Sequence, residues 1–197
     1  MTKSTFFVEE DKILSALFDE GLDNLHLYKP DSIPIYSERL LSLLPDDCYN
    51  KITVHDHYYL KSEYGLRGIH LDNPNDEIPA NYKGKISRTC LSIDSIKDMK
   101  RKCDYIFLKN IFDCIEFKEE KANFSIDELK IAAKDGLIDK KVYALGGLDI
   151  DNIKIAKDLG FGGIVICGGL WNKFDIHNEM NYTEIISHFE KLRKAID

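Results

Sequence analysis

The sequence of 197 residues predicts an α/β fold, a (β/α)8 barrel (TIM barrel) formed by a single domain, 1–197, with its first strand short or missing. Short apolar runs alternate with amphipathic helical patterns along the chain, and two Gly-Gly pairs, Gly146-Gly147 and Gly168-Gly169, follow apolar runs near its end. Alternating strands and helices with short connections indicate parallel strands joined by right-handed crossovers. Since such a barrel needs roughly 200 to 250 residues, few insertions fit.

In the first half of the chain, a helical pattern over 9–20 ends at Gly21, which suits the position after a helix. Pro30 stops the strand that follows, and Pro45 ends the next helix. Residues 72–84 hold two prolines, three asparagines and a glycine, and are expected to form a loop. The expected strands are 25–28, 52–54 and 68–71, and the other expected helices are 36–44 and 57–64.

In the second half, Ser92 is the expected N-cap of one helix, and Ser125 and Glu128 have the spacing of a capping box at the start of another. The expected strands are 85–87, 105–108, 142–145 and 163–166, and the expected helices are 92–102, one from 125, 151–159, a short one after Gly169, and 182–195. Only Thr5–Val8 precedes the first helix of the chain. Either these residues act as the first strand or it is missing, which predicts a gapped barrel or a chain whose true start lies upstream.

The composition limits the class of partner. The formal net charge is −7, whereas proteins that bind nucleic acids or membrane surfaces carry basic patches. Neither a signal peptide nor an apolar span of about twenty residues is present. The five cysteines are odd in number and never spaced as C-x-x-C, which favours a reducing compartment. We therefore expect a cytoplasmic protein that binds small molecules, and neither nucleic acid nor membrane.

The two Gly-Gly pairs, Gly146-Gly147 and Gly168-Gly169, are candidate phosphate-binding turns. Glycine lacks a Cβ, so backbone N–H groups can close around an anion, and a helix that starts just beyond adds its positive end. Two such turns on consecutive parallel strands form the phosphate site found after strands 7 and 8 of many barrels. The alternative interpretation is that these glycines only permit tight turns between strand and helix.

Three histidines, His26, His55 and His70, lie at or near the ends of neighbouring expected strands. His26 and Tyr28 share one face of their strand, because side chains alternate with a period of two. If that face lines the barrel interior, the histidines converge and can bind a transition metal together with Asp56. Packed, hydrogen-bonded histidines are the alternative.

The order of these segments resembles the thiamine phosphate synthase family, which includes the related thiazole tautomerases. The similar stretches cover nearly the whole chain and are 25–30, 54–56, 68–71, 86–89, 104–112, 144–147 and 160–171. The resemblance implies a (β/α)8 barrel and a transferase that joins a hydroxymethylpyrimidine diphosphate to a thiazole phosphate, with Mg2+, releasing pyrophosphate. It implies phosphorylated small molecules as partners and is compatible with a homodimer.

The resemblance also assigns site residues. Asp56 matches the metal-binding aspartate, and the glycine pairs match the turns that bind the thiazole or product phosphate. The matching catalytic positions are Lys29, Ser87 and Lys118, and the substrate- or phosphate-binding positions are His26, Tyr28, His55, Thr89, Gly146, Gly147, Gly168 and Gly169. The residue types allow other roles: Asp56 can cap the helix expected from His57, Ser87 and Thr89 can satisfy turn backbone, and both lysines can be solvated charges.

The chain departs from the family pattern where the diphosphate should bind. The family's Gln-Leu-Arg-x-Lys corresponds to 26–30, with Tyr28 in place of the arginine and Lys29 one position early. The diphosphate clamp falls at 114–117, where Glu116 adds a negative charge and Lys118 comes one residue late. Three interpretations follow: an active synthase, an impaired paralogue that still binds a thiazole or thiamine phosphate, and another phosphate-binding barrel enzyme.

Overall fold

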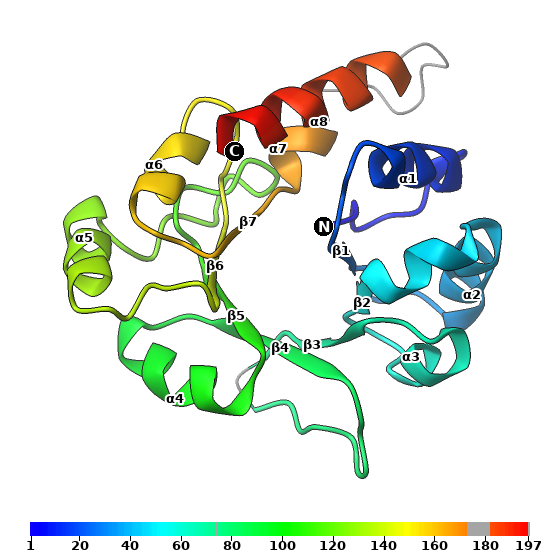
Figure 1. Cartoon of the computed structure of the whole chain (residues 1–197), viewed down its shortest axis with the longest axis horizontal. Helices are drawn as coiled ribbons and strands as arrows, with labels where there is room; N and C mark the ends of the chain where they lie inside the picture. Colours follow the sequence, from blue (N-terminus) through cyan, green and yellow to red (C-terminus); the bar gives the residue numbers. More distant parts are fainter. Residues whose placement is uncertain (74, 173–181, 197) are drawn as a thin grey trace.

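Seven parallel strands form a single sheet in sequence order in the computed structural model, which describes residues 1–73, 75–172 and 182–196. The strands curve around the middle of the molecule with the helices outside them (Figure 1). They are β1 (Leu25–Leu27), β2 (Ile52–Val54), β3 (Gly68–Leu71), β4 (Lys85–Cys90), β5 (Tyr105–Lys109), β6 (Val142–Leu145) and β7 (Gly163–Val165). Each strand expected from the sequence is therefore present, within two or three residues of its expected bounds.

The helices follow the strands as expected. They are α1 (Glu10–Asp19), α2 (Pro34–Leu43), α3 (Tyr59–Tyr64), α4 (Ile96–Lys102), α5 (Ile126–Lys134), α6 (Ile153–Asp158), α7 (Gly168–Trp171) and α8 (Tyr182–Ile196), with 3-10 turns at Asp46–Lys51 and Ile93–Ser95. The capping box of Ser125 and Glu128 is confirmed. Ser92 makes no side-chain cap, because the 3-10 turn separates it from α4. No described helix is long and apolar enough to cross a membrane.

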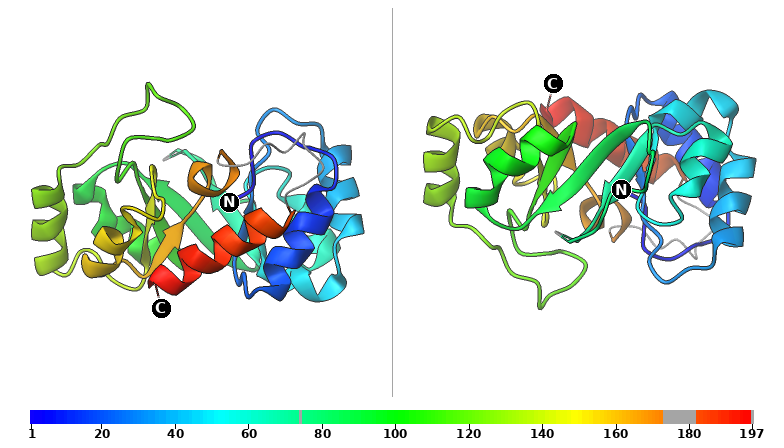
Figure 2. Two further views of the ribbon diagram at one scale, coloured as in Figure 1. Left: turned by 90° about the horizontal axis from the view of Figure 1, so that it is seen from above. Right: turned by 90° about the horizontal axis from the view of Figure 1, so that it is seen from below.

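In the described residues, no strand fills the place between β7 and β1, so the first strand of a complete barrel is missing. The sheet is therefore the gapped barrel that was one of the two outcomes expected from the sequence. Thr5–Val8 form no strand. Met1 and Thr2 lie in the gap instead: the amino group of Met1 donates to the carbonyl of Ile166 at 2.9 Å, and the N–H of Thr2 donates to the carbonyl of His26 at 2.9 Å. Both views of Figure 2 accordingly show the amino end of the chain among the elements of the fold.

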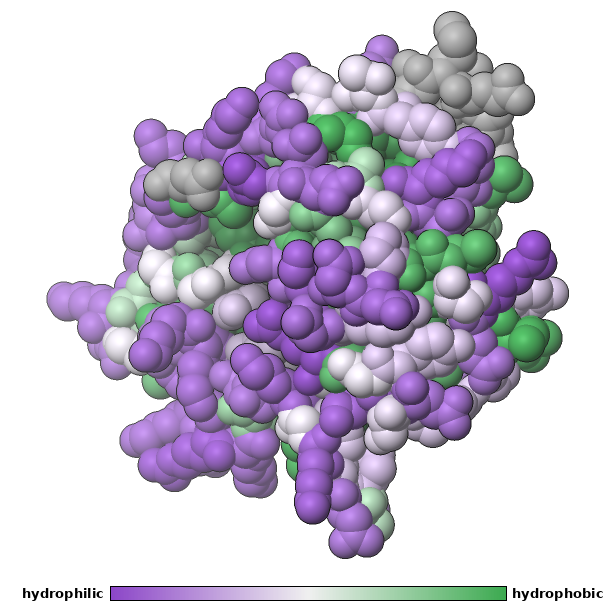
Figure 3. Space-filling view, turned by 45° about the vertical axis from the view of Figure 1, so that its right-hand side comes forward, coloured by the Kyte–Doolittle hydropathy of each residue, from purple (hydrophilic) through white to green (hydrophobic). Residues whose placement is uncertain are grey.

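Apolar side chains pack between the sheet and the helices. On β1 and β2, Leu25, Leu27, Ile52 and Val54 are buried in one cluster with the apolar face of α1. The neighbouring positions on these strands point to the other face, since side chains alternate along a strand. On the face of the molecule seen in Figure 3, hydrophilic side chains predominate and apolar ones form smaller areas between them.

Polar side chains occupy much of the barrel interior. The buried polar residues on the strands or directly after them are His26, Thr53, His55, His70, Ser87, Thr89 and Asn110. Barrel interiors are usually filled by branched apolar residues, so this interior is unusual. Polar groups buried together need hydrogen-bond partners, and their arrangement is therefore the place to look for a functional site.

Candidate functional site

A cavity of about 480 Å³ opens at the carboxyl ends of the strands. We call it the upper cavity. Tyr28, His55 and Thr89 contribute to its wall, as do both glycine pairs and the loop 114–117. Loops at this end of a parallel barrel carry the active sites of barrel enzymes. The structure therefore brings together most of the site residues predicted from the sequence.

Asp56 and Asp72 place two carboxylates in the wall of the upper cavity. The Oδ2 atom of Asp56 is buried without a hydrogen-bond partner among the described residues. Burial, and then the nearby Asp72, raise the pKa of Asp56, and burial raises the pKa of Asp72. Helix α3 begins at Tyr59 without any side-chain cap, so Asp56 is not the cap of this helix. An unpartnered carboxylate oxygen beside a second carboxylate fits the ligand preference of Mg2+.

The upper cavity is rich in negative charge. Among the described residues of its wall, Lys109 is the one basic side chain, and it pairs with Glu120 at 3.0 Å. The acidic side chains of the wall are Asp56, Asp72, Glu116 and Glu120. The Oε2 atom of Glu116 accepts a hydrogen bond from the thiol of Cys167 at 3.3 Å. A bare diphosphate would be repelled here, because the four carboxylates outnumber the cationic groups of the described wall. Those groups are Lys109, which is paired with Glu120, and the amino group of Met1, whose pKa is lowered by burial.

Lys29 and Lys118 do not supply the missing cations. The ammonium of Lys29 binds both carboxylate oxygens of Glu10, at 2.6 and 2.9 Å, and the carbonyl of Thr5 at 2.9 Å. Lys118 is an exposed loop residue and, like Lys29, does not belong to the cavity wall. The geometry gives Lys29 a structural role, so neither lysine is carried into the proposal below.

Gly146 and Gly147 both adopt positive φ values, 106° and 64°. A Cβ on Gly146 would lie 2.6 Å from Oδ1 of Asn110, and one on Gly147 would lie 2.2 Å from the carbonyl oxygen of Asp113. This pair thus lets the turn after β6 pack directly against the loop after β5. Close packing is sufficient to require glycine here, and anion binding is a further, separate prediction.

Gly168 and Gly169 begin the short helix α7 and also lie in the cavity wall. A Cβ on Gly169 would lie 2.2 Å from the carbonyl oxygen of Leu148, which excludes any side chain there. At Gly168 the nearest atom to a Cβ would be the Cβ of Ile115, at 3.1 Å. Gly168 therefore has a little more room and is the better position at which to test phosphate binding.

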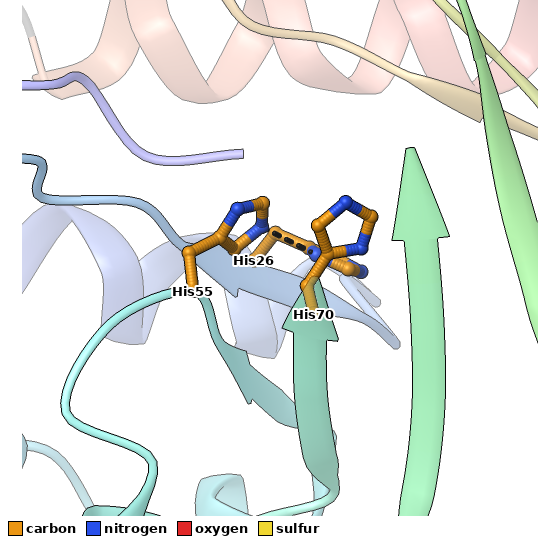
Figure 4. Close-up of side chains that lie close together, drawn as sticks. All are labelled: His26, His55 and His70. Atoms are coloured by element: carbon orange, nitrogen blue, oxygen red, sulfur yellow. Dashed lines mark hydrogen bonds between the residues drawn. The ribbon is translucent and has the colours of Figure 1, made fainter. Parts of the chain in front are cut away.

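The side chains of His26, His55 and His70 lie close together (Figure 4), and His55 lines the upper cavity. All three are buried, and one ring nitrogen of each lies within 4.8 Å of the others. Burial lowers the pKa of His55 to about 3 and lowers the pKa values of His26 and His70 well below the ordinary range. All three imidazoles are therefore neutral at pH 7.

A chain of hydrogen bonds runs through two of these rings. His55 Nδ1 lies 2.9 Å from the carboxylate of Asp72, His55 Nε2 lies 2.8 Å from His26 Nδ1, and His26 Nε2 lies 2.8 Å from the hydroxyl of Tyr105. An ionised carboxylate only accepts hydrogen bonds, so His55 Nδ1 donates to Asp72. It follows that His26 Nδ1 donates to His55 and the Tyr105 hydroxyl donates to His26. Asp72 thereby sets the tautomer of both rings.

His70 binds the two hydroxyl residues predicted for the site. Its Nδ1 lies 2.8 Å from Ser87 Oγ and its Nε2 lies 2.9 Å from Thr89 Oγ1. Its ring is stacked on that of His55, with the centroids 4.3 Å apart. Thr89 faces the upper cavity, whereas Ser87 lies beneath it. Ser87 therefore orients His70 in this structure.

Tyr105 is a site residue that the sequence reasoning missed. It is 5% exposed and stacks on Tyr143, with the ring centroids 4.8 Å apart. A usable signal was present: the period of two that places Ser87 and Thr89 on one face also places Tyr105 and Phe107 on one face of β5. The same alternation, applied to every strand, would have identified the polar residues that face the barrel interior.

A second cavity, of about 320 Å³, lies in the gap between β7 and β1. We call it the lower cavity. Met1 contributes to the walls of both cavities, His26 to the lower one and His55 to the upper one. His26 and His55, which are joined by a hydrogen bond, thus lie between the two cavities.

No protein-family model matches the chain, and no curated protein matches it. Among solved structures, thiamine phosphate pyrophosphorylase from Bacteroides thetaiotaomicron is 47% identical, with 98% of this chain and 94% of that chain covered and a TM-score of 0.90. Thiamine phosphate pyrophosphorylase from Pyrococcus furiosus is 17% identical, with 95% and 89% covered and a TM-score of 0.70. The native KDPGal structure is 14% identical, with 98% and 91% covered and a TM-score of 0.69. At these lower identities the last two show the fold alone.

Proposed function

The chain belongs to the thiamine phosphate pyrophosphorylase (thiamine phosphate synthase) family, and on that premise we propose that it joins hydroxymethylpyrimidine diphosphate to thiazole phosphate, giving thiamine phosphate and pyrophosphate. The observation that carries the proposal is the 47% identity to the Bacteroides thetaiotaomicron protein over 98% of the chain. The position of the upper cavity at the carboxyl ends of the strands supports it. Family membership argues against an unrelated phosphate-binding barrel enzyme.

The thiazole substrate brings its own nucleophilic nitrogen, so the protein needs no covalent nucleophile. It must hold two anionic substrates in line and keep water away from a reactive pyrimidine cation. We assign the thiazole phosphate to the wall formed by the two glycine pairs, and the pyrimidine to the floor near Tyr28, His55 and Thr89. Tyr28 lies close to His55, with the ring centroids 5.3 Å apart, which makes this floor largely aromatic.

Asp56, with Asp72 beside it, is the proposed Mg2+ ligand, because its Oδ2 atom is buried without a partner among the described residues. When bound, the cation would offset the charge of the departing diphosphate. The acidic wall makes this requirement stronger than usual, since Glu116 adds a negative charge to those of Asp56 and Asp72, and the Lys109 side chain of the wall is already paired with Glu120. Turnover is therefore expected to be slow and strictly dependent on the divalent cation.

One observation favours a second candidate function. The acidic wall suits thiamine phosphate, whose thiazolium ring is cationic, better than it suits a free diphosphate. On this alternative the protein binds thiamine phosphate, or thiazole phosphate, without catalysing its formation. The two functions differ only in chemistry at the diphosphate end.

The test is an assay of the full-length protein with both precursors and Mg2+, run beside a calorimetric titration with thiamine phosphate. Release of pyrophosphate together with formation of thiamine phosphate would support the synthase. Binding of thiamine phosphate without turnover at any Mg2+ concentration would support the second candidate. A protein that shows neither turnover nor binding of thiamine phosphate would contradict both candidate functions.

Location and assembly remain predictions. The cysteine pattern leads us to expect a cytoplasmic protein, and all five cysteines are free thiols in the structure. A homodimer is expected from the family resemblance, and sedimentation of the purified chain would check it. The proposal involves neither nucleic acid nor a membrane.

A further inference from the structure

The proposed reaction gives His26 and His70 no chemical role and gives His55 only a place in the floor beneath the pyrimidine. Each ring offers a nitrogen within 4.8 Å of the other two, and the three side chains come from β1, β3 and the residue after β2. Burial disfavours the charged imidazolium, so the rings present the neutral form that binds metals. Three neutral imidazoles at one point are a common ligand set for Zn2+.

Each ring also has an outer partner on one nitrogen. Asp72 lies 2.9 Å from His55 Nδ1, Ser87 Oγ lies 2.8 Å from His70 Nδ1, and the Tyr105 hydroxyl lies 2.8 Å from His26 Nε2. Metal-binding histidines almost always have such a partner, which fixes the ring orientation and raises the basicity of the ligating nitrogen. The remaining nitrogens are His55 Nε2, His26 Nδ1 and His70 Nε2.

We propose that these three nitrogens bind a transition metal ion of the Zn2+ class at the floor of the upper cavity. Zinc bound at about 2.0–2.1 Å to each nitrogen places the nitrogens about 3.3 Å apart in a tetrahedral site. His26 Nδ1 and His55 Nε2 are 2.8 Å apart, so they separate slightly, while His70 turns its Nε2 away from Thr89.

Binding of the metal ion at this site requires no release of a proton to solvent. The hydrogen on His26 Nδ1 moves to Nε2, where the oxygen of the Tyr105 hydroxyl accepts it. The hydroxyl then turns its own hydrogen toward Thr53 Oγ1, 3.5 Å away. His55 keeps its hydrogen on Nδ1 for Asp72, and His70 keeps its hydrogen on Nδ1 for Ser87. The fourth metal position is left for water or a ligand from the cavity.

This site differs in chemistry from the proposed Mg2+ site. Imidazole nitrogens favour Zn2+, Co2+, Ni2+ and Cu2+, whereas Mg2+ takes carboxylate oxygens and water. The inference therefore does not depend on the proposed function, and it can hold whether or not the chain is an active synthase. The negative charge of Asp72, directly behind His55, compensates part of the charge of the dication.

The test is titration of the chelator-treated full-length protein with Co2+ as the spectroscopic probe, followed by competition with Zn2+. We expect one equivalent of tetrahedral Co2+, with visible absorption bands and no thiolate charge-transfer band, displaced by Zn2+ and unaffected by excess Mg2+. His26→Gln and His70→Gln should weaken binding by more than the roughly 10–100-fold that loss of an outer partner costs. Ser87→Ala should weaken it by about 10-fold.

Glu119→Gln is the matched control, because it removes an exposed charge outside the cavity wall and leaves the imidazoles in place. Its Co2+ affinity should equal that of the natural sequence. Absence of stoichiometric Co2+ binding, a thiolate band, or unchanged affinity in folded His26→Gln and His70→Gln variants would each overturn the proposal. If a glutamine variant does not fold, Ser87→Ala decides, since unchanged Co2+ affinity in that variant also overturns it.

Discussion

The ammonium of Lys29 lies against both carboxylate oxygens of Glu10, at 2.6 and 2.9 Å, with the two side chains 1% and 2% exposed. The pair joins the segment after β1 to the start of α1, and the ammonium also lies 4.4 Å from the centroid of the Phe6 ring. Burial raises the pKa of Glu10 to about 7, although the lysine opposes that shift. Lys29, which the resemblance matched to a catalytic lysine one position away, thus serves to fix the first helix.

Replacing Lys29 with methionine should destabilise the fold by about 3–5 kcal/mol, because Glu10 is then left buried without its cation. Urea unfolding at pH 7 would measure the loss. Lys118→Met, at an exposed position, is the matched control and should change the free energy of unfolding by less than about 0.5 kcal/mol. A second variant with methionine at both Glu10 and Lys29 should recover much of the loss, and equal losses for the single and double variants would contradict the pairing.

Asp56→Asn should remove activation by Mg2+ while leaving thiamine phosphate binding in place. The amide is a much poorer ligand for the cation than the carboxylate, and the proposed phosphate-binding wall is elsewhere in the cavity. Initial rates against Mg2+ concentration would show the change, with Asp158→Asn on the outside of α6 as control. A wild-type response to Mg2+ in Asp56→Asn would mean that this carboxylate binds no metal.

Removing the charge of Glu116 should improve use of the diphosphate substrate. The carboxylate lines the upper cavity, so Glu116→Gln should raise kcat/KM by about fivefold, which corresponds to roughly 1 kcal/mol of relieved repulsion. Glu119→Gln, an exposed neighbour, should have no such effect. A rate that stays the same or falls in Glu116→Gln would show that Glu116 is not an obstacle to the diphosphate.

Acidification should destabilise the protein through the buried imidazoles. The pKa of His55 falls to about 3 on folding, so between about pH 6.5 and 3 the unfolded chain binds more protons and stability decreases as pH falls. From pH 7 to pH 5, His55 alone should cost about 2 kcal/mol. Unfolding curves at both pH values should show a smaller loss for His55→Asn than for the natural chain, and an equal loss would contradict this assignment.

The order and type of the elements could be predicted from the sequence. Apolar runs of three to six residues alternate with amphipathic helices, and this alternation is typical of parallel strands joined by crossover helices. The gap at the start of the barrel was also predictable as one of two outcomes, since Thr5–Val8 is the one candidate strand ahead of the first helix. The ion pair between Lys29 and Glu10 could not be predicted from the sequence. It depends on how α1 packs against β1, and nothing local to either residue specifies that Glu10 faces inward.

The site was predictable in part for a related physical reason. Residues at strand ends gather at one edge of a parallel sheet, so Asp56, Thr89 and the glycine pairs were brought together as expected. Lys118 was placed by alignment of a loop, and loops follow no period that would fix the direction of a side chain. Asp72 lies at the start of the loop expected over 72–84, where no period fixes the direction of a side chain, although it orients His55 and, through it, His26.

The polar residues of this barrel and the apolar residues that stabilise its fold lie on opposite faces of the same strands. The apolar side chains that hold the sheet to its helices point outward from the strands, whereas the buried polar side chains point inward on alternate positions of the same strands. A substitution on the inner set can therefore change the chemistry of the interior while leaving the apolar contacts between sheet and helices in place. Its cost in stability comes instead from the hydrogen bonds that join His26, His55 and His70 to their partners.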